Sequence, residues 1–154
     1  MQIYTLMRTN GRYIFLADDD VDDRVLFEDA LREVCKETVL ATATDGQEMM
    51  NKLQATVPPE PDVIFLDLNM PVKNGFECLE EIKSATKLKN IPIIVLSTSS
   101  EKEYVDKVYA QGADYYLCKP DSFNTLKKAI TSILNYDWSK HPKQPSRDSF
   151  LLSF

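Results

Sequence analysis

The segment PDVIFLDLNMPVKNG (Pro61–Gly75) combines the features that decide the fold. Its apolar run, Val63–Leu66, has no polar interruption, which is typical of a strand buried on both faces of a parallel sheet. Asp67 follows directly, and Pro71 and Gly75 then mark a loop. An acid at the carboxyl end of a parallel strand lies at the edge where open α/β sheets bind ligands. On this segment alone, a solvated aspartate that only marks the end of a strand explains Asp67 equally well.

The chain has 154 residues, of which 44% are hydrophobic and 27% are charged, enough for one domain with a substantial core. Its net charge of -6 argues against nonspecific binding to nucleic acid or to an anionic membrane. No apolar run approaches the roughly 20 residues of a membrane-spanning helix. The three cysteines are far apart and the single histidine, His141, lies in a polar segment, which argues against disulfides, zinc sites and histidine triads. We therefore expect a cytoplasmic protein that binds neither DNA nor a membrane directly.

Four further apolar runs alternate with helical patterns. The predicted strands are Tyr13–Ala17, Val39–Ala43, Val63–Leu66, Ile91–Leu96 and Asp114–Cys118. The predicted helices begin near Val21, Asp45, Gly75, Glu101 and Ser122. This alternation predicts an α/β fold with right-handed crossovers and helices on both faces of a parallel sheet. The natural closure is a flavodoxin-like, doubly wound sheet of five strands in the order 2-1-3-4-5, with five helices.

The first helix and the chain ends carry further expectations. In the first helix, the apolar residues are expected to face the core: Val21, Leu26, Phe27, Ala30, Leu31 and Val34. We predict a domain over residues 12–135 and an N-terminal arm, native or foreign to the protein, over residues 1–11. Residues 136–154 are predicted to form a loose tail whose apolar end docks on a neighbour or on the domain itself. About 20 residues after the last helix are too few for an output domain.

The carboxyl ends of all five predicted strands emerge at one edge of the sheet. They bring together Asp18–Asp20 from the first strand, Asp67 from the third, Ser97 from the fourth and Lys119 from the fifth. Such carboxylates would repel one another and raise their own pKa values unless a positive charge lay among them. Mg²⁺ prefers one or two carboxylates together with water and phosphate oxygens. The edge is therefore expected to hold Mg²⁺ and to receive a phosphoryl group.

Four motifs in order, ADDD, DLNMPVKNG, VLSTS and YYLCKP, resemble the receiver domain of two-component response regulators over about Tyr13–Leu134. The resemblance implies that Asp67 attacks a phospho-histidine donor and forms an acyl phosphate. It also implies Mg²⁺, or Mn²⁺, bound by Asp19, Asp67 and the backbone carbonyl of Asn69. Asp18 would act on the metal through a coordinated water.

The same resemblance implies roles for three more residues. Lys119 would contact the phosphoryl group, and the peptide bond to the following proline would be cis. Ser97 and Tyr116 would form the hydroxyl–aromatic switch. Thr98 offers a competing hydroxyl, but Ser97 lies 30 positions after Asp67, which is the interval usual in the family.

The leading hypothesis is a stand-alone receiver that accepts its phosphoryl group from a sensor histidine kinase or a His-phosphotransfer protein. Its downstream protein partner would bind the face formed by the fourth helix, fifth strand and fifth helix; homodimerisation is left open. The chain would not be an enzyme beyond self-phosphorylation from a donor and slow autodephosphorylation.

Two alternatives compete with this hypothesis. An Asp-nucleophile phosphohydrolase would usually place a second acid two residues after Asp67, where this chain has Asn69. A phosphorylation-independent adaptor with the same fold would not need the full set of Asp67, Lys119 and the two leading acids.

Overall fold

The structure is a computed structural model that describes residues 12–138 and 144–154. The predicted N-terminal arm and His141 lie outside these residues. The strands are β1 (Tyr13–Ala17), β2 (Val39–Ala43), β3 (Val63–Leu66), β4 (Ile93–Ser97), β5 (Tyr115–Cys118) and β6 (Leu151–Leu152). The helices are α2 (Val21–Val34), α3 (Gly46–Thr56), α4 (Gly75–Ser84), α5 (Lys102–Ala110), α6 (Phe123–Asn135) and α7 (Arg147–Phe150). None of the described helices is long and apolar enough to span a bilayer.

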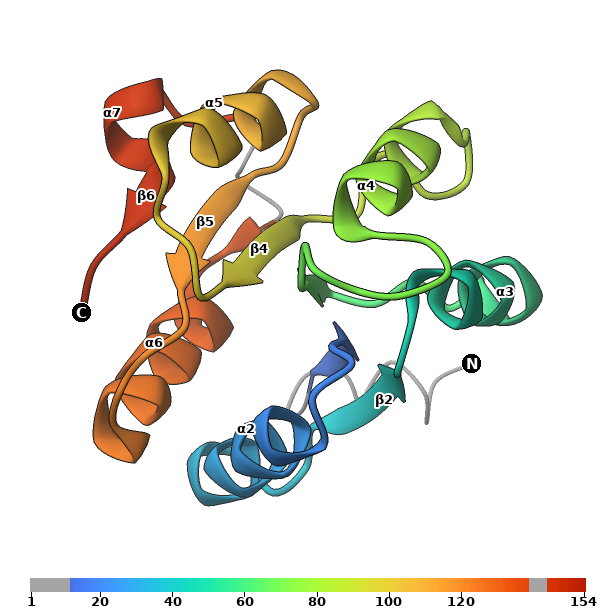
Figure 1. Cartoon of the computed structure of the whole chain (residues 1–154). Coiled ribbons are helices and arrows are strands. Elements are labelled where there is room, and N and C mark those ends of the chain that lie inside the picture. The colour runs from blue at the N-terminus through green and yellow to red at the C-terminus, as the bar shows by residue number, and fades with distance from the viewer. Residues whose placement is uncertain (1–11, 139–143) are drawn as a thin grey trace.

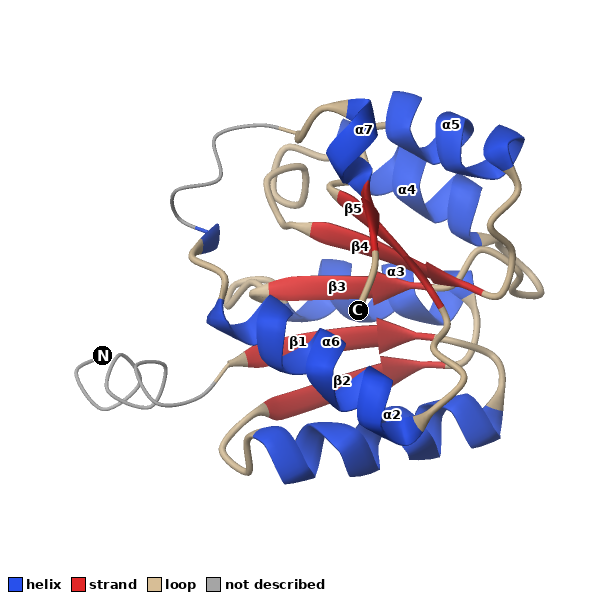
Figure 2. Ribbon diagram, turned by 90° about the vertical axis from the view of Figure 1, so that its left-hand side faces the viewer, coloured by secondary structure: helices blue, strands red, loops and turns tan. Residues whose placement is uncertain are grey.

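The strands form one parallel sheet in the order β2-β1-β3-β4-β5-β6, between two layers of helices (Figures 1 and 2). Successive residues of each central strand face opposite sides. Phe15 and Ile64 pack into the cluster that includes residues of α3, α4 and α5, whereas Leu16 and Phe65 pack into the cluster that includes residues of α2 and α6. Burial on both faces explains why these strands are uninterrupted apolar runs. The predicted parallel, flavodoxin-like fold and the order of its first five strands are confirmed.

Short polar caps start the helices soon after the strands end. The side chain of Asp20 accepts a hydrogen bond from the Asp23 amide at the start of α2, and Asn74 forms a capping box with Glu77 at the start of α4. These caps fix where each helix begins. The loops that join β1 to α2 and β3 to α4 therefore stay at the carboxyl edge of the sheet.

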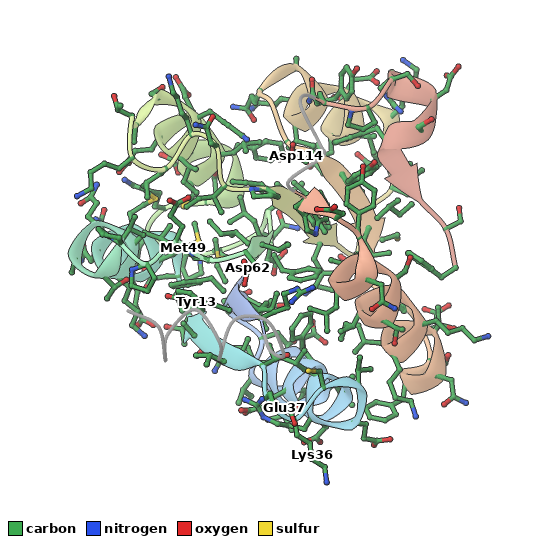
Figure 3. The ribbon with its side chains drawn as sticks, turned by 180° about the vertical axis from the view of Figure 1, so that it is seen from behind. Tyr13, Lys36, Glu37, Met49, Asp62 and Asp114 are labelled. Carbon is green, nitrogen blue, oxygen red and sulfur yellow. The ribbon has the colours of Figure 1, made fainter. Side chains whose placement is uncertain are left out.

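The opposite, amino edge of the sheet uses its acids structurally. Asp62 accepts a hydrogen bond from the Tyr13 amide at 2.7 Å, and the two residues are neighbours in Figure 3. Asp114 accepts one from the Ile93 amide at 2.8 Å and forms an ion pair with Lys83. Each of these carboxylates stabilises the start of a strand.

The expectation for the apolar face of α2 is wrong at two residues. Phe27, Ala30 and Leu31 are buried, but Val21 and Leu26 are 58% and 48% exposed. With about 100° between successive helical residues, Leu26 points well away from the face that carries Phe27. The first turns of α2 therefore present apolar side chains to solvent, next to the carboxyl edge of β1.

The chain end adds one strand and one helix to the five of each that were predicted. Phe150 of α7 is fully buried against Tyr109 and Tyr116, and β6 pairs with β5. The Gln144 side-chain amide donates to the Tyr109 and Ala113 carbonyls. The apolar end thus docks on the domain itself.

The expected cis bond before Pro120 is wrong. Within the described residues, the cis peptide bonds are Val57–Pro58 and Pro58–Pro59, so the Lys119–Pro120 bond is trans. Trans is the intrinsically preferred isomer of such a bond by about 0.5–1 kcal/mol.

Candidate functional site

Two neighbouring strands place two aspartates side by side. Ala17 at the end of β1 pairs with Leu66 at the end of β3, and the Asp67 amide donates to the Ala17 carbonyl at 3.0 Å. Asp18 and Asp67 are thus the first residues beyond two paired strand ends. Carboxylate oxygens of Asp18, Asp19 and Asp67 all lie within 4.8 Å of one another. This is the acidic cluster that the strand ends predicted.

Asp67 is charged at an energetic cost. Its side chain is almost fully buried, and the Asn69 amide donates to its Oδ1 at 3.3 Å. Burial raises the pKa of Asp67 to about 6, and the nearby Asp18 carboxylate adds to this effect. Lys119 and the Asn69 amide pull the pKa in the other direction without cancelling the rise. The positive charge and the amide near Asp67 therefore do not fully compensate for the burial of its carboxylate.

Lys119 follows β5 and brings the compensating cation. Its Nζ lies 2.7 Å from Asp23 Oδ2, 2.9 Å from Asp18 Oδ2 and 3.4 Å from Asp67 Oδ2. Burial lowers the pKa of this ammonium, but hydrogen bonds to Asp23 and Asp18 outweigh burial and raise it overall. Lys119 is therefore a permanent cation that is shared among three carboxylates.

The hydroxyl candidates on the loop after β4 differ in burial. Ser97 is fully buried and its Oγ accepts a hydrogen bond from the Ser99 amide, whereas Thr98 is exposed. Tyr116 is also fully buried, and its hydroxyl donates to the Ser99 carbonyl. A chain of contacts thus links Ser97, the loop and the aromatic ring of Tyr116, which itself packs against Phe150.

The acidic cluster fits a hard divalent cation. It offers carboxylate oxygens from Asp18, Asp19 and Asp67, the ligand type that Mg²⁺ and Mn²⁺ take. Burial, together with the neighbouring Asp18 carboxylate, raises the pKa of Asp67, and a bound cation would counter both effects. At the amino edge, Asp62 and Asp114 instead accept hydrogen bonds from backbone amides.

The structure brings Asp18, Asp19, Asp67 and Lys119 together as predicted by the strand ends. Asn69 follows with an exposed side chain. The argument from strand ends does not find Asp23, because this residue lies in the first turn of a helix. The sequence marks Asp23 only as an acid in the first helical turn, soon after three consecutive aspartates. An acid at that position also stabilises a helix by interacting with its dipole, so the pattern does not distinguish the two roles.

Comparison with known proteins matches residues 14–131 to the response regulator receiver domain family. Response regulator Rcp1 of Synechocystis is 33% identical over 129 residues, which cover 81% of this chain and 88% of that protein. The structure is also similar to the phosphorylated cyanobacterial phytochrome response regulator RcpA, with a TM-score of 0.76, 34% identity, and coverage of 88% of this chain and 99% of that one. The Mn²⁺-bound form of Rcp1 gives a TM-score of 0.72 at 32% identity with the same coverages.

Proposed function

The chain belongs to the response regulator receiver domain family of two-component signalling, and from this premise we propose that Asp67 is its phosphoacceptor. The observation that supports this most directly is the position of Asp67. It is a buried carboxylate at the end of a central strand, it lies within 4.8 Å of two other acids, and Lys119 is 3.4 Å away. Asp19 is exposed, whereas Asp18 is also buried and also contacts Lys119. What sets Asp67 apart from Asp18 is its place in the motif DLNMPVKNG, at the position that the family resemblance gives to the phosphoacceptor.

In the proposed reaction, an oxygen of the Asp67 carboxylate attacks the phosphorus of a phospho-histidine. The new P–O bond forms as the P–N bond breaks, and the imidazole leaves with the bonding electron pair and takes up a proton. Lys119 pairs with an equatorial oxygen of the phosphoryl group, and Ser97 donates a hydrogen bond to another. Burial of Asp67 keeps the carboxylate poorly solvated and therefore reactive.

The proposed metal is Mg²⁺, with Mn²⁺ as a substitute, held by Asp19, Asp67 and the Asn69 backbone carbonyl, with Asp18 acting through water. When bound, the metal supplies positive charge to the carboxylates and to the phosphoryl oxygens. The Mn²⁺-bound relative and the three clustered carboxylates support a divalent cation at this position.

Histidine kinases or His-phosphotransfer proteins are the donors implied by the family. A protein donor would meet an apolar surface beside Asp67. Val21, Val25 and Leu26 of α2 are all about half exposed, and Leu26 lines a small pocket together with Lys119. We propose that the donor docks on this start of α2.

For the downstream partner we propose the predicted face, which corresponds to α5, β5 and α6. The chain's own residues 144–152 occupy part of it, because β6 pairs with β5 and Arg147 forms an ion pair with Asp106 of α5. A partner on this face would therefore contact residues 144–152 as well. The Ser97–Ser99–Tyr116 contacts link this face to the end of β4, at the same edge of the sheet as Asp67, which supports a phosphorylation-dependent surface.

The experiment is intact-protein mass spectrometry after incubation with a small phosphodonor and Mg²⁺. Wild type should gain the mass of one phosphoryl group, Asp67→Asn should gain none, and Asp22→Asn, which removes an exposed acid, should behave as wild type. An adduct that survives in Asp67→Asn would refute the assignment.

The phosphohydrolase alternative is disfavoured by Asn69, whose amide cannot act as a general acid two residues after the nucleophile. Receiver domains are signalling proteins in general, and we propose that this chain dephosphorylates itself only slowly. Steady turnover of a phosphate ester that depends on Asp67 would favour the enzyme instead.

A further inference from the structure

Asp23 is a fourth carboxylate in the site, and it is the one nearest to the ammonium of Lys119. Lys119 Nζ lies 2.7 Å from Asp23 Oδ2, against 3.4 Å from Asp67 Oδ2. Asp23 comes from the first turn of α2, whereas the other three acids come from loops at strand ends. Its side chain is 36% exposed, so it lies at the rim of the site, while Asp18 and Asp67 are buried.

The start of α2 is held against the acidic cluster by two contacts. The Asp20 side chain accepts a hydrogen bond from the Asp23 amide at 3.0 Å, and the Arg24 side chain donates to the Asp18 carbonyl at 2.8 Å. The first contact fixes the backbone of Asp23, and the second ties the helix to the loop after β1. Asp23 is therefore positioned to receive the ammonium of Lys119, which crosses from the loop after β5.

An ammonium has three N–H donors, and Lys119 has three carboxylates within reach. Two of them, Asp18 and Asp67, belong to the cluster that fits a divalent cation. The ammonium and the cation therefore compete for the same oxygens. Asp23 supplies an acceptor outside that cluster, and so it draws the ammonium toward the rim.

We propose that Asp23 is a positioning residue: it holds Lys119 at the rim of the site, which leaves Asp18 and Asp67 accessible to a divalent cation. This inference rests on the proposed function, because it assigns the cation to the same cluster. Without Asp23, Lys119 keeps only Asp18 and Asp67 as carboxylate partners among the described residues, and it settles deeper in the cluster. The loss of a negative charge and the deeper ammonium both weaken cation binding.

The test is isothermal titration of the metal-free full chain with Mg²⁺. Asp23→Asn should weaken Mg²⁺ binding about three- to tenfold, as expected when a neighbouring carboxylate is lost and an ammonium moves closer to a divalent ion in a high dielectric. Asp22→Asn removes the same charge from the same turn but from an exposed side chain, and should change the affinity less than twofold. Asp23→Glu, which keeps the carboxylate, should restore binding to near the wild-type value.

A double-mutant cycle with Lys119→Ala separates positioning from simple charge. With the lysine absent only the loss of charge remains, so Asp23→Asn should weaken Mg²⁺ binding clearly less than it does in the wild-type background. An equal loss in both backgrounds would show that Asp23 acts without Lys119 and would overturn the proposal, as would equal affinities of Asp23→Asn and Asp22→Asn. Thermal unfolding of each variant confirms that it is folded.

The two hypotheses fail in different ways. If wild type binds Mg²⁺ and is phosphorylated on Asp67 but the cycle shows no coupling, the role of Asp23 is refuted and the proposed function stands. If wild type binds no Mg²⁺, the metal site and the role of Asp23 are refuted together.

Discussion

Replacing Asp67 by asparagine should stabilise the metal-free protein. Burial raises the pKa of Asp67 from 3.8 to about 6. The difference is about 2 pH units, and at about 1.4 kcal/mol per unit the ionised carboxylate costs the folded state about 3 kcal/mol above pH 7. Asparagine keeps the shape of the side chain without the charge. The free energy of unfolding of Asp67→Asn should therefore exceed that of wild type by up to about 3 kcal/mol at pH 8.

The sign of the pH dependence follows from proton binding. Because the folded-state pKa of Asp67 is raised, the folded protein binds more protons than the unfolded chain between about pH 6 and pH 3.8. This contribution to the free energy of unfolding thus rises as the pH falls through about 6. The advantage of Asp67→Asn should shrink to about half at pH 5, whereas titration of the other acids is common to both proteins and cancels in the difference.

The assay is urea unfolding in the presence of a chelator at pH 8 and pH 5, with Asp114→Asn as the control. Asp114 is a similarly buried aspartate, but it accepts the Ile93 amide and pairs with Lys83, so its replacement should not stabilise the protein. An Asp67→Asn variant that is no more stable than wild type at pH 8, or whose advantage is the same at both pH values, would refute the reasoning.

Three further predictions concern packing around the site. Phe150→Ala should lower the free energy of unfolding by about 3–5 kcal/mol in urea titrations, because Phe150 is fully buried, whereas Phe154→Ala, at an exposed position, should change it by less than about 0.5 kcal/mol. Gly75→Ala should weaken Mg²⁺ binding measured by calorimetry, because a Cβ at Gly75 would lie 2.3 Å from the Asp67 carbonyl oxygen and force that backbone to move. Burial raises the pKa of Cys78 to about 12, so an aromatic disulfide reagent should label it only after unfolding, and Cys78→Ser should leave the native thiol count unchanged.

The sequence was sufficient to predict the sheet and its acidic edge because both depend on local patterns. A strand buried on both faces can be predicted from its own uninterrupted apolar run, without reference to the strands beside it. Parallel strands then necessarily bring their carboxyl ends to one edge. Asp67 and Lys119 were found in this way, although they lie 52 positions apart in the chain.

The features that were missed depend on contacts between distant segments. Asp23 reads as an outward helical acid, and only the crossing of Lys119 over the start of α2 gives it a partner. The strand β6 has two residues, too few for any periodicity. Its docking depends on Phe150, whose burial requires Tyr109 and Tyr116 from two other elements.

The cost of the ionised Asp67 and its proposed role have the same physical origin. Burial of the ionised Asp67 lowers the free energy of unfolding by about 3 kcal/mol. A group that neutralises this carboxylate can recover up to that amount. Saturation with a cation at 100 times its dissociation constant stabilises a folded protein by about 2.7 kcal/mol. Wild type in such a concentration of Mg²⁺ should therefore approach the stability of metal-free Asp67→Asn, and the variant itself should gain much less from the metal. If Mg²⁺ stabilised both proteins equally, the cation would bind elsewhere, and the excess negative charge at Asp67 would have no part in recruiting it.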